Sequence, residues 1–425
     1  MTMQANHDTD GRAYGHIAGK PDEDLVRCGP GTKGGELLRR YWQPIAMAED
    51  ATSRPKLIKA LGEELVLFRS AEGEVGLLYP RCAHRGTSLL YGKVEEKGIR
   101  CCYHGWLFSP CGTCLETPCE PSSDTKNRVR QPWYPVVEKF GMVFAYMGPP
   151  AEQPEFPTIS LELDMQEGEY LVAKENTSGP NGPHPKIAAS NDYNWFQLFD
   201  NFADPFHVAI THYAINGMQF TESFGIMPEV ETKYTDDGVV NRSLRRLPDG
   251  RLHQRIAQVI MPNLHCTPGV TDEDMSYSSI GWLVPADDTS YRHYVLYRMG
   301  PNNDAIANLE LLGFLKDNWG PKHGRPFREW SLEDHQNWQT DYASQKGQGD
   351  ITLHSEEHLT VPDTAIGMAR RMFKKQGLAV ASGKSPVGAG AGVKRLIEVK
   401  SGNAFLDPQT HKMIKGITPE WDSIG

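Results

Sequence analysis

The sequence predicts an α+β protein with two domains: an N-terminal all-β domain and a larger C-terminal domain that combines helices with an antiparallel sheet. Two observations support this fold class. Short strand-like segments surround two loops that each contain cysteine and histidine, and a long hairpin pattern precedes a helical pattern that begins at Asp363. With 425 residues, of which 39% are hydrophobic, the chain is long enough to bury two cores.

The first domain is expected at residues 21–150, after a flexible N-terminal tail at residues 1–20. A Gly-Pro-Pro sequence at residues 148–150 marks its end, because neither residue type continues a strand well. Residues 37–42 suggest a short helix. Apolar runs predict the strands of this domain at residues 65–68, 136–137 and 142–146.

The second domain is expected at residues 151–380 and is predicted to be α+β. Asp363 is predicted to cap a helix that runs to Lys375. A glycine-rich loop and a tail are expected to follow, at residues 381–425. A hairpin around a Pro-Asp-Gly turn and one further strand are predicted at residues 239–247, 251–261 and 291–299.

Composition limits the partners of the chain. A net charge of −10 argues against nucleic acid or an anionic membrane as the main partner. The sequence contains no apolar run of about 18 residues and no signal-peptide pattern at its polar start. Its cysteines cluster instead of spreading in pairs, which is typical of a reducing compartment. The protein is therefore expected in the cytoplasm.

The most informative motif pairs Cys82 with His84 and Cys101 with His104. Each pair must lie in one tight loop, and two such loops would bind one Rieske-type [2Fe–2S] cluster, with thiolates on one iron and imidazoles on the other. Two ferric ions, two sulfides and two thiolates sum to zero charge, whereas four thiolates would give minus two. The Rieske arrangement is therefore easier to reduce, and the loops are predicted to form an electron port.

A structural zinc site is the alternative, because Cys111 and Cys114 have the CxxC spacing of zinc ribbons. Zinc would need a second close ligand pair, and the good candidates already form the two cysteine–histidine loops. Gly86 and Gly105 favour the cluster, since the backbone must approach sulfide closely there. Cys111, Cys114 and Cys119 are left without a role and are expected to be free thiols.

A second metal motif lies in the larger domain, where His207 and His212 follow an aromatic-rich segment. Side chains five residues apart point about 140° apart in a regular helix, so both can bind one ion only where the helix is distorted. Pro205 provides a cause for distortion. Such histidines are more often ordinary core or surface residues. The electron port favours metal binding, because an iron site with two histidines, one carboxylate and open positions would accept its electron and activate O₂.

Together these motifs resemble the Rieske non-heme iron oxygenases, which include aromatic ring-hydroxylating enzymes. The second cluster loop has their Tyr-His-Gly-Trp sequence at residues 103–106, although Ala83 stands where proline is frequent. The resemblance implies a Rieske domain followed by a helix-grip (START-like) catalytic domain. The AsnxxAspxxHisxxxxHis signature of that catalytic domain is matched by Asn201, Asp204, His207 and His212.

The resemblance also implies roles for these residues. His207 and His212 would bind ferrous iron, while Asp204 would connect His207 to the cluster ligand His104 of a neighbouring subunit. The alternative for Asp204 is a helix cap.

Two downstream aspartates compete for the position of third iron ligand. Asp341 is favoured, because the stretch that follows it resembles phthalate 4,5-dioxygenase-like oxygenases, in which the earlier aspartate is the ligand. Asp363 would then only cap its helix.

The family resemblance implies the oxygenase component of a multicomponent system, with one [2Fe–2S] cluster and one mononuclear Fe(II). No predicted strand leads into a GxGxxG sequence, as an NAD or flavin fingerprint requires, so a separate NAD(P)H-dependent reductase, with or without a ferredoxin, must supply electrons. The subgroup implies a homotrimer or a dimer of trimers in which each Rieske domain serves the neighbouring iron. A Rieske electron carrier without oxygenase activity is the alternative, and it would hold about two irons per chain instead of three.

The preferred activity is O-demethylation of a methoxylated aromatic carboxylate, because residues 101–118 resemble the dehydrodivanillate O-demethylase group. Ring dihydroxylation of a phthalate-like acid is the alternative, since the outcome depends on which carbon lies nearest the oxygen. Surface solvation is the competing role for any arginine proposed to bind the carboxylate. The candidate substrate-binding residues are Asn201 and three hairpin arginines, Arg242, Arg246 and Arg255.

Overall fold

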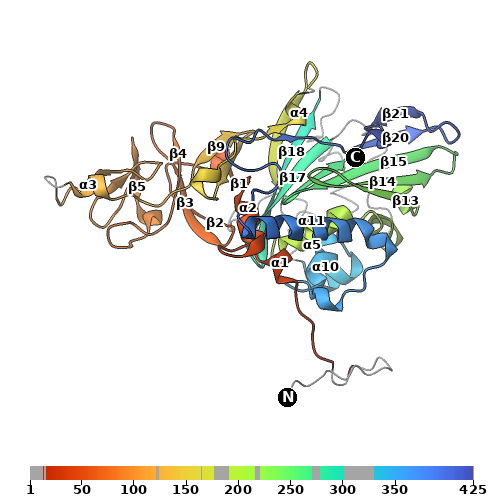
Figure 1. Cartoon of the computed structure of the whole chain (residues 1–425), viewed down its shortest axis with the longest axis horizontal. Helices are drawn as coiled ribbons and strands as arrows, with labels where there is room; N and C mark the ends of the chain where they lie inside the picture. Colours follow the sequence, from red (N-terminus) through yellow and green to blue (C-terminus); the bar gives the residue numbers. More distant parts are fainter. Residues whose placement is uncertain are drawn as a thin grey trace.

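The computed structural model describes residue 13 and residues 16–120, 124–163, 165–176, 191–215, 221–269, 278–300 and 330–424. Figure 1 shows an elongated molecule with small sheets toward one end and a large sheet with its helices at the other. Most of the tail expected at residues 1–20 lies outside the described residues. Its last residue, Lys20, is anchored through its backbone N–H, which donates to Ser355 Oγ at 2.7 Å.

Three small antiparallel sheets form the N-terminal domain, in the orders β1–β10–β9, β2–β3–β4 and β5–β6–β7–β8. The strands predicted here are confirmed as parts of β3, β9 and β10. The sheets consist of β1 (Trp42–Met47), β2 (Lys56–Ala60), β3 (Glu63–Arg69), β4 (Val75–Leu78), β5 (Lys93–Glu95), β6 (Gly98–Arg100), β7 (Leu107–Phe108), β8 (Cys114–Glu116), β9 (Val136–Lys139) and β10 (Met142–Tyr146).

The helix suggested over residues 37–42 is wrong in its bounds. α2 (Lys33–Arg39) begins earlier, because Thr32 caps it by accepting from the N–H of Gly35, and Trp42 already belongs to β1.

One large antiparallel sheet forms the C-terminal domain, in the order β12–β18–β17–β16–β15–β14–β13. The predicted hairpin and the strand after it are confirmed as β14, β15 and β18. The bounds are β12 (Tyr170–Asn176), β13 (Glu229–Tyr234), β14 (Gly238–Arg246), β15 (Leu252–Ile260), β16 (Leu264–Pro268), β17 (Ser278–Asp287) and β18 (Ser290–Met299), with a short parallel pair, β11 (Thr158–Ile159) and β19 (Leu396–Ile397), beside it.

The expectation of a loop and tail over residues 381–425 is wrong for most of that segment. β20 (Gly402–Leu406) pairs with β15, and β21 (Met413–Ile417) pairs with β20, so the C-terminal residues extend the large sheet. The physical reason is burial of apolar side chains: Leu406 packs with Leu252, and Trp421 packs against β14 and β15.

Two helices, α5 (Trp195–Ala203) and α11 (Thr364–Ala381), lie along one face of the large sheet (Figure 1). Their aromatic residues share a buried core with α1 and α2, so that core spans both domains. Asp363 is the N-cap residue of α11, as predicted, but the helix continues to Ala381 instead of ending at Lys375. Within the described residues, no helix is long and apolar enough to cross a membrane.

The remaining helical elements are short. They are α1 (Glu23–Val26), α3 (Thr125–Arg128), α4 (Ser160–Leu163), α6 (His207–Ala209), α9 (Leu332–Asn337), α10 (Asp341–Gly347), a π-helical turn η4 (Ile210–Ala214) and the 3₁₀ turns η1 (Ala48–Asp50), η2 (Leu89–Tyr91), η3 (Pro150–Glu152), η5 (Glu222–Gly225), η7 (His354–Glu356), η8 (Val361–Asp363) and η9 (Trp421–Ser423).

Candidate active site

The two cysteine–histidine loops have the same backbone design. Gly86 donates its N–H to the carbonyl of Cys82 at 2.8 Å, and Gly105 donates to the carbonyl of Cys101 at 3.1 Å. Both glycines have positive φ, +73° and +72°, a conformation that a side chain would strain. The chain therefore forms two matching tight turns, as the repeated motif predicts.

The side chains of these loops are arranged as a [2Fe–2S] cluster requires. The rings of His84 and His104 lie edge to face with their centroids 4.6 Å apart, while the thiols of Cys82 and Cys101 are buried. Nδ1 of His104 is buried without a hydrogen-bond partner, which is expected of an iron-ligating atom. Burial raises the pKa of the Cys82 thiol to about 11, so its thiolate form needs a bound metal cation.

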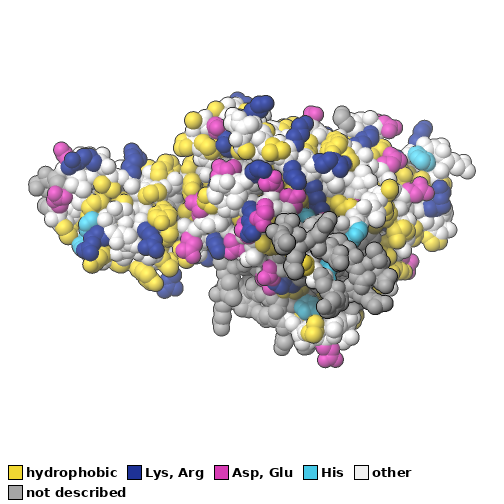
Figure 2. Space-filling model, turned by 60° about the horizontal axis from the view of Figure 1, so that its bottom comes forward, with side chains coloured by type: hydrophobic (Ala, Val, Ile, Leu, Met, Phe, Trp, Pro, Cys, Tyr) yellow, Lys and Arg dark blue, Asp and Glu magenta, His cyan; other side chains and the backbone are white. Residues whose placement is uncertain are grey.

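Gln131 supports the first loop, and the sequence motifs did not identify it. Its carboxamide accepts from the N–H of Ala83 at 2.8 Å and donates to the carbonyls of Tyr79 and Arg81 at 2.8 and 2.9 Å. Figure 2 shows histidine side chains at the surface of this end of the molecule, with cationic side chains nearby. His84 is exposed, so an electron donor can reach the cluster edge directly.

The zinc alternative has no support in the described residues. Cys111 contacts Ser109 Oγ at 3.2 Å, and Cys114 donates to the carbonyl of Glu116 at 3.7 Å. No third ligand side chain gathers with these two cysteines in the described part of the chain. Cys111, Cys114 and Cys119 form no disulfide in the described structure.

The variant His104→Cys is expected to shift the cluster to a lower reduction potential, by about 100 mV or more, and to abolish turnover. The reason is that an added thiolate charge opposes reduction. Potentiometric titration followed by electron paramagnetic resonance measures the shift. An unchanged potential together with full activity would contradict the Rieske assignment.

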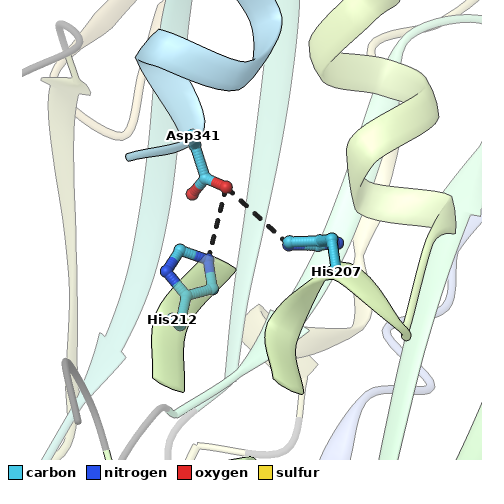
Figure 3. Close-up of side chains that lie close together, drawn as sticks. All are labelled: His207, His212 and Asp341. Atoms are coloured by element: carbon cyan, nitrogen blue, oxygen red, sulfur yellow. Dashed lines mark ion pairs between the residues drawn. The ribbon is translucent and has the colours of Figure 1, made fainter. Parts of the chain in front are cut away.

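In the larger domain, His207, His212 and Asp341 converge (Figure 3). Nε2 of His212 lies 3.3 Å and Nε2 of His207 lies 3.8 Å from Oδ1 of Asp341, and the three ligand atoms all lie within 4.8 Å of one another. Two imidazole nitrogens and one carboxylate oxygen are a donor set typical of a non-heme iron site with open positions.

The backbone around the two histidines is distorted, as their five-residue spacing predicts. Asp204 and Pro205 separate α5 from α6, and η4 then adds a π-helical turn in which the N–H of Ile215 donates to the carbonyl of Ile210 at 3.1 Å. A π turn winds more slowly than an α-helix, so it brings His212 round toward the side of His207. The distortion thus lies after Pro205 as well as at it.

Asp341 is fixed by its helix and by Asn201. It is the first residue of α10, and Asn201 Nδ2 lies 3.4 Å from its Oδ1, while Gln345 Nε2 donates to Asn201 Oδ1 at 2.9 Å. Burial raises the pKa of Asp341, but attraction to His212 and His207 outweighs it and holds the pKa well below its usual range. Asp341 is therefore a permanent anion in this site.

Asp363, the competing third ligand, is used elsewhere. Its carboxylate accepts from the backbone N–H and the hydroxyl of Thr360 at 2.7 and 2.9 Å. The structure thus brings Asp341, not Asp363, to the two histidines.

Asp204 contacts both the backbone and the iron-site histidine. Its Oδ1 accepts from the N–H groups of Phe206 and His207 at 2.8 and 3.4 Å, and its Oδ2 lies 3.5 Å from Nδ1 of His207. Burial raises its pKa, but the contact with His207 outweighs this, and the net pKa lies below its usual range. Asp204 thus holds the turn that leads into α6 and lies beside His207, while its connection to His104 of a neighbouring subunit remains a prediction. The β5–β8 sheet, which carries the cluster loops, lies far from α5 in the same chain (Figure 1).

A cavity of about 200 Å³ opens beside the three converging side chains. A benzene-sized ligand fills a cavity of roughly 150 Å³, so one substituted ring can occupy this space. Its lining comes from α5, the turn around His207, η5, β14, β15, β16 and α10, and comprises Asn201, Phe202, Asp204, Pro205, His207, Val208, His212, Phe224, Asn241, Ser243, Arg245, Arg255, Ala257, Thr267 and Asp341.

The predicted arginine clamp is wrong for Arg242 and Arg246. Arg242 pairs with Glu231 at 2.6 Å and lies over the Trp421 ring, and strand alternation directs Arg246 to the same outer face. Arg255 does line the cavity. Sequence reasoning missed Arg245, which reaches the cavity from the inner face of β14.

Comparison with known proteins agrees with this geometry. Residues 41–138 match the Rieske [2Fe-2S] domain family. The chain is 42% identical to the phenoxybenzoate dioxygenase subunit alpha of Ectopseudomonas oleovorans, across 93% of this chain and 94% of that relative. It is 30% identical to the 5,5'-dehydrodivanillate O-demethylase oxygenase subunit of Sphingobium sp., across 87% and 82%. A crystal structure of dicamba monooxygenase bound to dicamba has the same fold, with a TM-score of 0.59 and 19% identity across 82% of this chain and 99% of that one.

The fold and the paired metal sites define a Rieske-type oxygenase. The chain belongs to the Rieske non-heme iron oxygenases and is an oxygenase alpha subunit of that family. It carries a [2Fe–2S] cluster and a mononuclear iron, and the α+β fold expectation is confirmed. Membership of this family selects an oxygenase over an electron carrier.

Proposed function

We propose that this oxygenase component oxidises an aromatic carboxylate. His207, His212 and Asp341 would hold the mononuclear iron, and Cys82, His84, Cys101 and His104 would hold the cluster that supplies its electron. The iron supplies O₂ activation when bound. The cavity would then hold one ring of the substrate beside the iron ligands.

Arg245 and Arg255 carry this proposal, because they place buried positive charge in the cavity wall. Their residues are only 1% and 8% exposed, and neither pairs with a carboxylate in the described structure. Arg245 donates from Nε to the carbonyl of Ile226 at 3.0 Å, and its Nη1 is buried without a partner. A bound carboxylate would supply the missing partner.

The lowered pKa values of the two arginines support the proposal of an anionic ligand. Burial lowers the pKa of Arg255 to about 9, with a further contribution from Arg245, and burial lowers the pKa of Arg245 to about 10. Two like charges held so close in a buried wall favour an anionic ligand over a neutral one. The same cavity offers Phe202 and Phe224 to the apolar ring.

Ring dihydroxylation is the first candidate reaction, because the chain is 42% identical to a phenoxybenzoate dioxygenase subunit. Demethylation, the preferred expectation from the motifs, remains the second candidate through the 30% identity to the dehydrodivanillate O-demethylase subunit. Both need two electrons from NAD(P)H by way of a separate reductase, with or without a ferredoxin. The cytoplasm is the proposed location.

Labelled oxygen distinguishes these reactions. The purified protein, with a surrogate reductase, would be given ¹⁸O₂ and a panel of phenoxybenzoate, phthalate and methoxylated benzoates, each beside its neutral amide. Dihydroxylation places two labelled atoms in the product. Demethylation leaves none in the phenol, which keeps its own oxygen, and releases formaldehyde. Equal turnover of acids and amides would overturn the proposed carboxylate recognition.

The variant Arg245→Met is expected to raise KM for the carboxylate substrate by about 10- to 100-fold, because it removes a charge-assisted hydrogen bond worth roughly 1.5–3 kcal/mol. The unfolding midpoint should stay the same or rise, since a buried unpaired charge is lost. Steady-state kinetics and thermal unfolding measure both effects. Arg242→Met, on the outer face of the same strand, is the matched control and should leave KM unchanged. A lower midpoint with unchanged KM would assign Arg245 a structural role only.

We also propose that electrons cross between chains. The cluster loops and Asp204 lie in separate parts of one chain, so His104 of one chain would approach Asp204 of a neighbour in a homotrimer or a dimer of trimers. Sedimentation analysis of the holoprotein tests the assembly, and a fully active monomer would contradict it.

A further inference from the structure

Two buried histidines meet behind the cavity and have no part in the reaction described so far. His265 on β16 and His293 on β18 are separated by β17, yet their Nε2 atoms lie 2.8 Å apart. Gly281 on β17 makes this possible, because a Cβ atom there would lie 2.0 Å from Nε2 of His265. A glycine inside a central strand is unfavourable by itself, so this one has a packing reason.

Burial holds both imidazole rings of the pair in their neutral form. Burial lowers the pKa of His293 to about 3, and burial together with His293 lowers the pKa of His265 well below its ordinary value. Both rings are therefore neutral at neutral pH, and each has one N–H donor and one nitrogen acceptor. One ring must donate to the other across the 2.8 Å contact, in either of two tautomeric arrangements.

The pair is connected to the cavity. Nδ1 of His265 lies 3.2 Å from the hydroxyl of Thr267, and Thr267 lines the cavity. The ring of Phe202, another cavity residue, stacks on His265 with 3.5 Å between centroids and 5° between planes. Both residues are buried, and His293 is the less buried of the two, at 9% exposed against 3% for His265. Side chains with exchangeable protons thus form a continuous series of contacts from His293 through His265 to Thr267 in the cavity wall.

The oxygenase reaction needs protons in that cavity. Dihydroxylation combines a ring double bond, O₂, two electrons and two protons into a diol. Demethylation combines a methoxyl group, O₂, two electrons and two protons into a phenol, formaldehyde and water. In both cases the electrons come from the reductase and the protons from solvent.

We propose that His293, His265 and Thr267 form a proton relay that delivers solvent protons to the oxygenase cavity. When one end of the relay accepts a proton, the other end releases one. This happens because each neutral imidazole loses the proton of its N–H group as its second nitrogen accepts a new proton. The relay rests on the oxygenase reaction but not on the choice of substrate, since both candidate reactions consume two protons. Thr267 is its delivery end, and the histidines act through Thr267.

The test compares Thr267→Val, which removes the hydroxyl at nearly constant volume, with Thr267→Ser, which keeps it. Thr267→Val is expected to slow product formation about tenfold or more, to increase the solvent deuterium isotope effect and to divert O₂ to hydrogen peroxide. Thr267→Ser, which keeps the hydroxyl, is expected to keep the wild-type isotope effect and the wild-type share of O₂ diverted to hydrogen peroxide. Cys266→Ala, a buried neighbour on the same strand, is the packing control and should keep a normal isotope effect.

Two further measurements separate a relay from a structural contact. The double variant Thr267→Val, His293→Phe should form product no more slowly than the slower of the two single variants. Either substitution alone already interrupts the relay, so the second one has nothing further to remove. Nitrogen NMR of histidine-labelled resting protein should show both rings neutral, whatever the activity.

Three results would overturn the relay: a charged imidazole in this pair, wild-type rate and isotope effect in Thr267→Val, or additive losses in the double variant with an unchanged isotope effect. Thr267→Ser must form product for this test to be read. The relay can therefore fail in Thr267→Val while the proposed substrate class still holds.

Discussion

Replacing Asp341 with alanine is expected to remove the mononuclear iron and abolish turnover, while the red [2Fe–2S] cluster remains. Asp341 supplies the only anionic oxygen within 4.8 Å of both histidine nitrogens in the described residues, so its loss leaves a neutral two-nitrogen site. Metal analysis should fall from about three irons per chain to about two. The visible and electron paramagnetic resonance spectra of the cluster should not change, because the cluster lies in the other domain.

The matched control is Asp363→Ala. That carboxylate accepts from the N–H and hydroxyl of Thr360, in the capping box of the 3₁₀ turn η8, and makes no side-chain hydrogen bond to α11, so the variant should lose at most about 1 kcal/mol of stability and keep its iron. The choice of third ligand would be wrong if Asp363→Ala lost the iron and Asp341→Ala kept it.

Asp204→Asn is expected to load both metal centres and yet slow electron transfer between them by orders of magnitude. The structure separates the two oxygens of this carboxylate: Oδ1 accepts from the backbone, and Oδ2 faces Nδ1 of His207. An asparagine can keep the backbone contact through its carbonyl oxygen, but its NH₂ group then faces an imidazole N–H that also donates. The cap survives, and the connection to the imidazoles is lost.

Stopped-flow reoxidation of the reduced cluster, with O₂ and substrate present, measures this effect. The unfolding midpoint should match the wild type, whereas Asp204→Ala should also lose about 1 kcal/mol of stability as the cap disappears. Oxidation of substrate by added peroxide should survive in Asp204→Asn, because that route bypasses the cluster. Wild-type reoxidation would show that Asp204 is only a helix cap.

Local chemistry allowed much of this site to be predicted. The cluster loops could be identified because ligand type, spacing and the glycines that close each turn all lie within a few residues. The distorted helix between His207 and His212 followed from a spacing that a regular helix cannot accommodate. Strands β14 and β15 followed from alternation and a Pro-Asp-Gly turn.

Features set by distant packing could not be predicted in this way. Both faces of β14 carry polar residues, with Asn241, Ser243 and Arg245 on one face and Arg242 and Arg246 on the other, so the sequence pattern does not tell which face is buried. In the structure the face of Asn241, Ser243 and Arg245 lines the cavity. The sequence around Gly281 does not indicate why a glycine is required there, because the two histidines that it accommodates come from the strands on either side. The C-terminal strands were missed because their apolar residues are few and follow a glycine-rich loop.

The pairing of β20 with β15 sets the order in which the protein can mature during synthesis. Nη1 of Arg255 donates to Asn403 Oδ1 at 3.3 Å, and Asn403 follows Arg255 by 148 residues in the chain. The segment that matches the Rieske family, residues 41–138, leaves the ribosome long before Asn403 does. At roughly 5–20 residues per second, the small sheets have many seconds to form while the cavity-lining strand β15 still lacks its neighbour β20. The nascent chain can thus form its electron-transfer domain well before β20 joins the sheet that lines the binding cavity.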